Sequence, residues 1–267
     1  MRILRTSAFV LISVLVACGG GGKNNNPDAA PPDMPVDMPP PVDMPPDMPA
    51  LDFSCETSSS PTTAPDPLAL AGSANDIDIL TQMPKAVDGA AIAAFKRGAN
   101  KDTKLDETTS DAQGAWTFSL VTGGAALDGY VEGSKTGQRT ARLYPPNPLA
   151  MDFTNAPLLM LADGTFNLLV QNLLQDTQSD ANGTIALAVV DCANTPISGA
   201  TISVSQGGNE VGRQHELTQL SAGTFIVLDV PPGDTVVGAM AMGHTLHAHT
   251  VTSVAKTTTT TAITPLP

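Results

Sequence analysis

The chain has 267 residues, and its 26 acidic side chains outnumber 13 basic ones, which gives a formal net charge of −13. So acidic a surface repels phosphate backbones, and the sequence holds no basic run and no basic patch with interleaved aromatic residues. Nucleic acid is therefore excluded as a partner.

The first 17 residues have the pattern of an export signal. Arg2 and Arg5 provide positive charge, and Ala8–Val16 is an apolar stretch of nine residues, too short to span a bilayer of about 30 Å as a helix. The stretch ends in Leu15-Val16-Ala17-Cys18 and is followed by Gly19–Gly22. An ordinary secretory signal with an incidental cysteine, or a short buried helix, is the alternative interpretation.

This segment resembles the lipobox of bacterial lipoproteins, in which a small residue precedes the acylated cysteine. The resemblance implies cleavage after Ala17 and lipidation of Cys18. The mature chain would then be bound to a membrane by several acyl chains, which hold a protein more firmly than one chain does. Because Gly19 rather than Asp follows the cysteine, the sorting pattern of such lipoproteins implies the outer membrane. The mature chain would keep 11 basic against 26 acidic residues, since Arg2 and Arg5 leave with the signal.

Once Cys18 is assigned to lipid, two of the three cysteines remain, Cys55 and Cys192. An even number of cysteines in an exported protein favours a disulfide between them. Two free thiols, or bonds to other molecules, are the alternatives. Neither cysteine has a neighbouring histidine or second cysteine at the spacing of a metal or redox site.

Residues 18–67 are predicted to form a lipid-bearing, disordered tether. Four copies of Asp-Met-Pro, beginning at Asp33, Asp37, Asp43 and Asp47, place prolines and repelling carboxylates at regular intervals. At about 3.1 Å per residue, residues 19–51 could extend on the order of 100 Å. A proline-rich segment can also be the ligand of a peptide-binding domain, but a simple spacer is the preferred interpretation.

Beyond residue 67 the sequence predicts an all-β fold: two tandem antiparallel β-sandwiches of the seven-strand type, at 68–163 and 183–267. Short Val-, Ile- and Thr-rich segments alternate with Gly, Pro, Asn and Asp turns, as is typical of sandwiches. The strands expected in the second sandwich are Thr184–Val190, Thr201–Ser205, Glu216–Leu220, Thr224–Val230, Thr235–Ala241, His247–Val254 and Thr257–Ile263.

The second sandwich resembles the carboxypeptidase regulatory-like domain, a transthyretin-like sandwich. The resemblance rests on the opening Pro196–Val204, on Gly223-Thr224-Phe225, on Asp229-Val230-Pro231-Pro232-Gly233, and on Gly243. We expect Phe225, Val227 and Asp229 to share one strand face and the Pro-Pro-Gly turn to form a tight hairpin. The family is non-catalytic, and in peptidases it is an accessory domain.

The same plan recurs more faintly in the first sandwich. Ala86–Ala93 parallels the opening, Trp116–Leu120 alternates so that Trp116, Phe118 and Leu120 share a buried face, and Gly137 stands where Gly243 does. Residues 121–128 replace the Pro-Pro-Gly turn. We therefore expect a divergent copy of the second sandwich.

Residues 164–182 are predicted to form a short helix and a loop between the sandwiches. Thr165 can cap this helix, with Phe166, Leu169, Val170 and Leu173 at helical spacing. Another strand is the alternative. Within the loop, Gln178–Gly183 partly matches a calcium loop, but Val189 stands where that motif needs a bidentate Glu, so a solvated loop is preferred.

Three of the four histidines lie close together, at His244, His247 and His249. On a strand, His247 and His249 would point to one face and could hold zinc with a third ligand such as His215. A polar outer face beside Thr245 is the preferred alternative, so no metal site is assigned.

No Gly-x-Ser-x-Gly motif and no paired acid and base indicate an enzyme, so we expect no catalytic residue and no cofactor. The expected function is that of a monomeric, membrane-anchored binding or structural module of the cell envelope, whose partner is an unidentified envelope protein or a glycan. A carbohydrate-binding surface protein is one alternative, disfavoured because the mature chain has few aromatic residues to form a platform. A metal-dependent protein or enzyme that uses the His244–His249 segment is the other.

Overall fold

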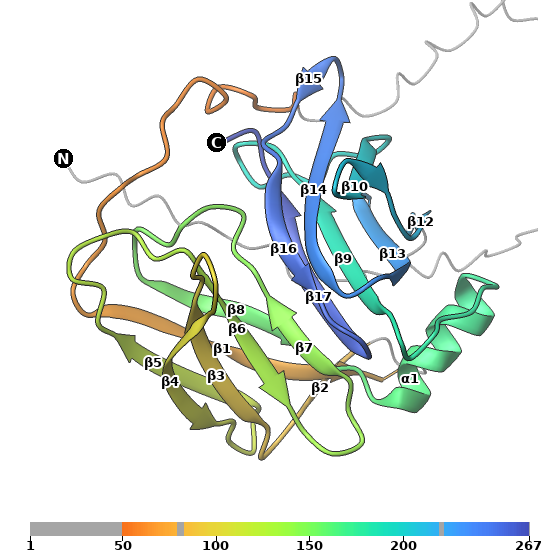
Figure 1. Ribbon diagram of the computed structural model, residues 1–267, viewed down its shortest axis with the longest axis horizontal. Coiled ribbons are helices and arrows are strands. Elements are labelled where there is room, and N and C mark those ends of the chain that lie inside the picture. Colours follow the sequence, from red (N-terminus) through yellow and green to blue (C-terminus); the bar gives the residue numbers. More distant parts are fainter. Residues whose placement is uncertain (1–49, 79–82, 219–221, 267) are drawn as a thin grey trace, which may run out of the picture. The chain divides into compact units, whose positions relative to one another are not determined.

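A computed structural model describes residues 50–78, 83–218 and 222–266. The expected signal, Cys18 and the Asp-Met-Pro repeats lie outside these ranges. No helix within the described ranges is long and apolar enough to span a membrane. The fold is mostly β, with one short helical segment (Figure 1).

The first half of the fold, residues 68–163, holds eight strands: β1 (Leu68–Ile77), β2 (Pro84–Ala86), β3 (Ala91–Lys96), β4 (Thr103–Thr109), β5 (Ala115–Leu120), β6 (Gly129–Ser134), β7 (Thr140–Leu143) and β8 (Phe153–Leu159). Strands β2, β1 and β5 form one sheet, to which β8 adds by pairing in parallel with β1. Trp116, Phe118 and Leu120 all point into the core, as their alternation predicts.

The second half, residues 183–266, holds nine strands: β9 (Gly183–Val189), β10 (Thr201–Gln206), β11 (Asn209–Glu210), β12 (Arg213–Glu216), β13 (Thr224–Val230), β14 (Gly233–Ala241), β15 (His244–Thr245), β16 (His249–Ser253) and β17 (Thr257–Ile263). One sheet has the order β11-β10-β14-β15, with β16 also paired to β14. Strands β13 and β17 have the predicted bounds, but the predicted strand Glu216–Leu220 is wrong, because β12 ends at Glu216 and the described residues 217 and 218 are not in a strand.

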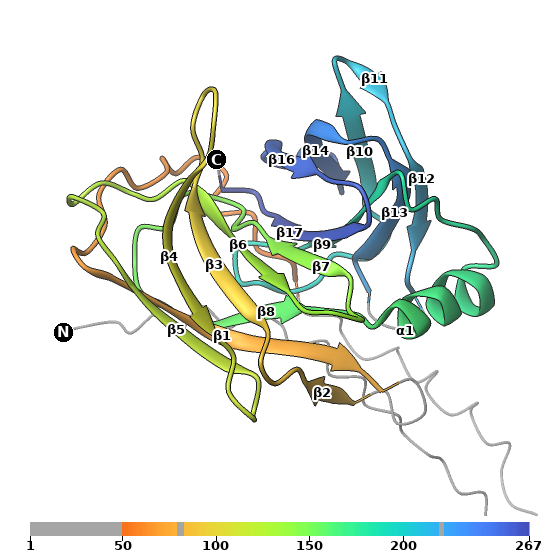
Figure 2. The same ribbon diagram turned by 60° about the horizontal axis from the view of Figure 1, so that its bottom comes forward.

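The two halves share a sheet, which the prediction of two separate antiparallel sandwiches did not include. An eight-stranded sheet runs β12-β13-β9-β17-β7-β6-β3-β4, and β17 pairs in parallel with both β9 and β7 (Figure 2). Nearly every residue of β17 is buried. Such complete burial is usual for a parallel strand that is covered on both faces, and β-branched residues such as threonine favour strand conformation.

The core is also continuous between the halves. Tyr130 and Tyr144 of the first half belong to the buried cluster of the second, and their rings are stacked with centroids 4.7 Å apart. The described residues from Leu51 onward therefore form one compact unit rather than two independent domains.

The predicted helix is present but begins earlier than expected. Helix α1 (Asp163–Leu168) continues into a π-helical turn, η1 (Leu169–Leu173), and Ala162 rather than Thr165 is at its N-cap. The backbone N–H of Ala162 donates a hydrogen bond to the Asp76 carboxylate, 3.2 Å away. This bond holds the chain at the residue where the helix begins. Asp163 then lies in the first turn, where negative charge is favourable.

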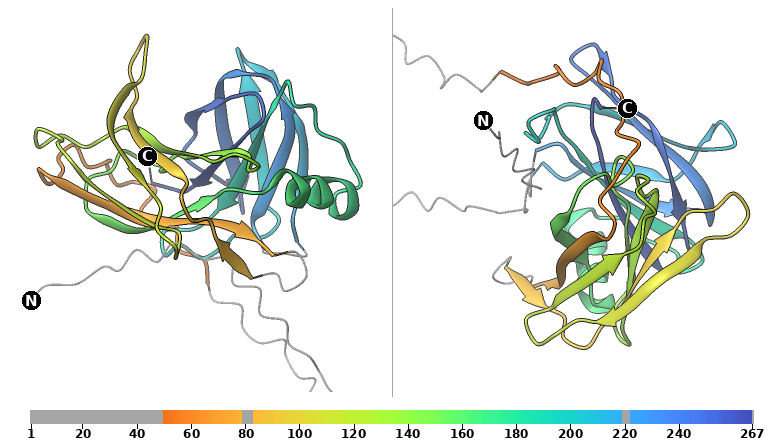
Figure 3. Two further views of the ribbon diagram at one scale, coloured as in Figure 1. Left: turned by 90° about the horizontal axis from the view of Figure 1, so that it is seen from below. Right: turned by 90° about the vertical axis from the view of Figure 1, so that its left-hand side faces the viewer.

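The helical segment (Figure 3) packs against the face of β13 opposite the main core. Phe166 and Val170 pack with Ile226 and Leu228, while Phe225 of the same strand faces the main core. Strand β13 is therefore buried on both faces.

Two basic side chains, one of them buried, hold the helix in place where the two halves meet. The Arg139 guanidinium, only 2% exposed, lies 4.1 Å above the centre of the Phe166 ring and 3.3 Å from the Asp180 carboxylate. Lys256 pairs with Asp163 at 3.3 Å. The helix is thereby attached to both halves.

Two expectations for β13 and its turn are wrong. Strands β13 and β14 lie in different sheets, so Pro231-Pro232-Gly233 connects two layers and closes no hairpin. Two successive prolines provide no N–H for a hairpin ladder, which explains this outcome. A register shift between Val227 and Val230 gives Asp229 a φ of 55° and turns it away from the face of Phe225.

Gly137 and Gly243, which the sequence places at equivalent positions, both have a φ of 84°. Such a conformation strongly favours glycine. Other described glycines, such as Gly114 and Gly212, have similar φ values, so the divergent repeat stays a prediction.

Candidate functional site

The part of the chain that follows the predicted tether is folded onto the second half. We call residues 51–58 the strap. Leu51 and Phe53 pack against the main core cluster, and a turn over residues 54–57 is closed by hydrogen bonds from Glu56 N to Phe53 O and from Ser58 N to Cys55 O. The predicted tether boundary at residue 67 therefore lies beyond the point at which packing begins, because the sequence switches to apolar Leu51 and Phe53 earlier.

A disulfide joins the strap to the second half. Cys55 and Cys192 are bonded, with their Cα atoms 5.7 Å apart, within the usual range for this bond. The backbone N–H of Cys55 also donates to the Cys192 sulfur at 3.0 Å. The two cysteines are 137 residues apart, so the closed loop contains the whole first half.

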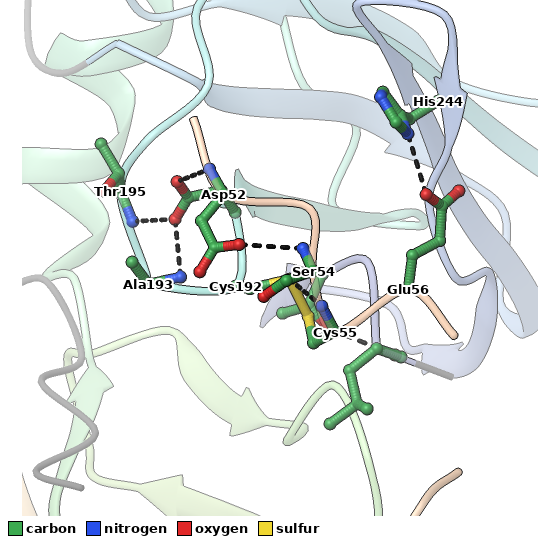
Figure 4. The surroundings of a disulfide bond; sticks show 11 residues. Asp52, Ser54, Cys55, Glu56, Cys192, Ala193, Thr195 and His244 are labelled. Carbon is green, nitrogen blue, oxygen red and sulfur yellow. Dashed lines mark hydrogen bonds and ion pairs between the residues drawn. A yellow bond between two sulfur atoms is a disulfide. The ribbon is translucent and has the colours of Figure 1, made fainter. Parts of the chain in front are cut away.

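The loop that carries Cys192 is organised by one buried carboxylate. Asp191, 2% exposed, accepts hydrogen bonds from the backbone N–H groups of Ala193 and Thr195 through Oδ1, and from Asp52 through Oδ2 (Figure 4). The Cys192 N–H donates in turn to the Asp52 carbonyl at 2.8 Å. Because a buried carboxylate is costly unless it is hydrogen-bonded, these bonds fix both the loop and the strap.

His244 makes the other contact with the strap. Its ring stacks on Phe53 with the centroids 4.0 Å apart and the planes 2° apart, and its Nδ1 lies 2.8 Å from the Glu56 carboxylate (Figure 4). The sequence singled out His244 as a possible metal ligand; the structure engages it with the strap.

His249 and His215 have separate partners, and His247 lies before β16, which begins at His249. His249 Nε2 contacts the Thr261 hydroxyl at 2.8 Å, and His215 Nε2 lies 2.8 Å from the Asp176 carboxylate. Burial, together with the nearby His247 and Arg97, lowers the pKa of His249 to about 4. Within the described ranges, no group of three or more His, Cys, Asp or Glu side chains could hold a metal ion.

A second polar cluster, which the sequence did not reveal, joins the loop after the helical segment to two strands. Arg213 bridges two carboxylates, Asp176 at 3.0 Å and Asp229 at 2.6 Å. The hydrogen bond from Arg213 holds the pKa of Asp176 well below its usual range. Burial alone would raise the pKa of Asp229, but the Ser179 N–H and Arg213 outweigh it and lower that pKa. The cluster joins the loop after the helix to β12 and β13.

The comparisons with known proteins name no family. No family model matches the sequence, and no curated protein matches it. Solved structures with partial similarity include the Bacillus anthracis TIE protein, at 10% identity and a TM-score of 0.25, over 74% of this chain and 33% of that one. This chain therefore spans about a third of the TIE protein chain.

Two further structures give similar values. The E269A mutant of the shaft pilin spaA from Lactobacillus rhamnosus GG has 10% identity and a TM-score of 0.25, over 76% of this chain and 98% of that one. A fimbrial protein from Bacteroides ovatus ATCC 8483 has 6% identity and a TM-score of 0.21, over 76% and 49%. These values are too low to support an inference about function.

Proposed function

We propose that the chain is a non-catalytic lipoprotein of the outer membrane. In this proposal Cys18 bears the lipid, the Asp-Met-Pro segment is a spacer, and the unit from Leu51 onward is a binding or structural module. The observation that carries the proposal is the strap, because it secures the chain where the predicted spacer ends.

The position of the strap suits a module that is pulled by its membrane anchor, because the strap determines where tension enters the folded unit. Tension on a membrane anchor would enter the folded unit at Leu51 and reach Cys55 four residues later. From there the disulfide would pass it to Cys192, at the beginning of the second half. The first half, inside the closed loop, would carry no load and stay folded for a partner.

The chemistry of the titratable groups supports a non-catalytic role. His244 is engaged with Phe53 and Glu56, and His215 with a carboxylate that Arg213 already holds ionised. These contacts need no catalytic role to explain them, because ion-pair networks that only stabilise a fold also shift pKa values.

The glycan alternative gains no support from the surface. Every aromatic side chain in the described part of the chain is buried or partly buried, Phe53, Phe95 and Phe153 being the partly buried ones. A glycan platform needs exposed rings on which sugars stack. An envelope protein is therefore the preferred partner.

The anchor is tested by metabolic labelling with a fatty acid in a bacterial host. The unchanged chain should be labelled and sediment with the outer membrane, whereas Cys18→Ser should remain an unlabelled precursor. Cys192→Ser is the matched control, because it removes another cysteine and should still be labelled. Labelling of Cys18→Ser would contradict the proposal.

The binding role is tested by crosslinking in the same host. The anchored chain should yield a reproducible crosslink to one envelope protein, and Cys18→Ser should reduce it, because anchoring raises the local concentration of both partners. Hydrolysis of peptide, ester or glycosidic substrates at enzyme-like rates by the purified chain would contradict the non-catalytic assignment.

A further inference from the structure

A cavity of about 360 Å³ lies inside the first half, away from the strap and the disulfide. It lies between the two facing sheets of that half and the segment 145–152, which connects β7 to β8, and it is partly open to solvent; Pro61 and Leu266 also line it. Figure 2 shows these sheets facing each other, with β1, β5 and β8 on one side and β3, β6 and β7 on the other.

Small residues explain why the space between the sheets is not filled. Ala94 and Ala156 line the cavity where larger side chains would close it. Gly129 has no room for even a methyl group, because a Cβ there would lie 2.1 Å from the Phe95 carbonyl oxygen. Gly129 therefore marks a close contact between the neighbouring strands β6 and β3 of one sheet.

The walls of the cavity are apolar. Leu70 and Leu120 line it from one sheet, and Val131 and Leu143 from the other. Its volume is within the range of ligand pockets, roughly 300–1,000 Å³. Since an apolar cavity of about 150 Å³ holds a benzene molecule, this one has room for about 14 non-hydrogen atoms.

The cavity also has polar lining residues, which would face the polar end of a ligand. Asn147 lines it, and its Oδ1 is shielded from solvent without accepting a hydrogen bond from any described residue. Asp152 also lines it and is exposed, so its carboxylate lies where the cavity meets solvent. Among the described lining residues, Asp152 alone is charged, and none is Lys, Arg or His.

We infer that this cavity binds the single aliphatic tail of an amphiphile whose head group is uncharged or cationic and donates hydrogen bonds. The tail lies between the sheets, and the head group lies at the opening, where Asp152 attracts positive charge. An anionic head group meets Asp152 without a compensating cation and binds more weakly. This binding does not depend on the lipid anchor or on the strap.

The test uses residues 18–267 with Cys18→Ser, so that no attached lipid and no detergent compete. Binding is measured by the fluorescence of 1-aminonaphthalene, a neutral probe small enough for the cavity, whose emission changes in apolar sites. The competitors are dodecylammonium, dodecanol and laurate, below their aggregation concentrations, because they share one tail length and differ in head-group charge. All three should displace the probe, and dodecylammonium should do so at a concentration about tenfold lower than laurate.

Two variants locate the site. Ala150→Trp, at the rim, should abolish probe binding while circular dichroism remains unchanged. Asp152→Asn keeps an oxygen that can accept the Ala69 N–H and should reduce the tenfold preference to about twofold. Asp111→Asn is the matched control, since that carboxylate also accepts backbone hydrogen bonds, from Gln113 and Ala115, but lies outside the cavity.

Three results would overturn the inference: no probe binding to the starting protein, equal displacement by laurate and dodecylammonium, or a preference that Asp152→Asn leaves unchanged. If Ala150→Trp fails to fold, the inference is still tested by the preference for dodecylammonium over laurate and by the effect of Asp152→Asn on that preference. Failure here would leave fatty-acid labelling of Cys18 unaffected, so the two proposals are tested separately.

Discussion

The His244 ring lies flat against Phe53, with 4.0 Å between the ring centroids, although the two residues are 191 positions apart in the chain. Glu56 pairs with the same imidazole at 2.8 Å. A residue of the β15 strand is thus held by two side chains of the strap. This contact sets the position of the strap together with the disulfide.

Replacing His244 should loosen the strap. His244→Ala removes both the stacked ring and the contact with the Glu56 carboxylate, and we expect it to lower the free energy of local strap opening by about 1–2 kcal/mol. Hydrogen exchange of the amides of residues 52–58 would measure this change. His244→Phe is the matched control, because it keeps the ring and should recover most of the protection, and equal exchange in both variants would contradict a role for stacking.

His249 should make stability depend on pH in a defined window. Its folded-state pKa of about 4 lies below the ordinary 6.5, so the unfolded chain binds the proton more readily. Stability should therefore fall as the pH is lowered from about 6.5 to 4, by up to about 3 kcal/mol, and this contribution should level off below pH 4.

Urea unfolding between pH 7 and pH 4 would measure the effect, with His249→Gln as the comparison. That variant should lose this slope. The carboxylates of Asp176 and Asp229, whose pKa values are lowered, contribute stability that is lost only at more acidic pH. A slope that is the same in both proteins between pH 6.5 and 5 would rule out His249 as its source.

Gly72 should tolerate no side chain. A Cβ at Gly72 would lie 2.0 Å from the Ala156 carbonyl oxygen and 2.5 Å from the Trp116 ring, because β8 runs directly beside β1 at this point. We expect Gly72→Ala to destabilise the fold by more than about 3 kcal/mol, since backbone atoms must move.

The matched control for Gly72→Ala is Gly164→Ala, at an open position in helix α1 where a Cβ meets nothing within 4 Å. There the change should stabilise by about 0.5–1 kcal/mol. Thermal unfolding of both variants would measure the difference, and a Gly72→Ala protein as stable as the starting chain would contradict the parallel pairing of β1 with β8.

Local patterns in the sequence predicted the individual elements well. The Thr224–Val230 and Thr257–Ile263 strands follow from β-branched runs bounded by turn residues, and assigning Cys18 to lipid left Cys55 and Cys192 as a pair. These inferences use residues near one another in the chain, or a count of a single residue type. Patterns of this kind also indicate burial, as at Trp116.

The pairing between distant elements could not be predicted in the same way. β17 is a run of threonines with no alternation, so nothing local indicates that it inserts between β9 and β7. The strap likewise depends on the long-range contacts of Asp52 with Asp191 and of Phe53 with His244. The cavity arises where small side chains, Ala94 and Ala156, line the space between the sheets, and this becomes visible only once the sheets face each other.

The disulfide should determine how the protein extends under force. With handles at residue 18 and at the C-terminus, the oxidised chain should transmit load from Cys55 to Cys192, so the residues between them add no length when the fold opens. In the Cys55→Ala/Cys192→Ala variant these residues extend as well. The separation of 137 residues then adds about 450 Å to the final extension, at roughly 3.3–3.6 Å per residue.

Optical tweezers would measure this difference in contour length. Treatment of the unchanged chain with a reductant is the matched control and should reproduce the extension of the double variant. The loop-closure entropy of the same bond should also make the oxidised chain more stable by about 5 kcal/mol in the chain-entropy model, which chemical unfolding would detect. Equal extensions for oxidised and reduced protein would mean that the bond does not carry the load, and the proposed force path from Leu51 to the second half would then be wrong.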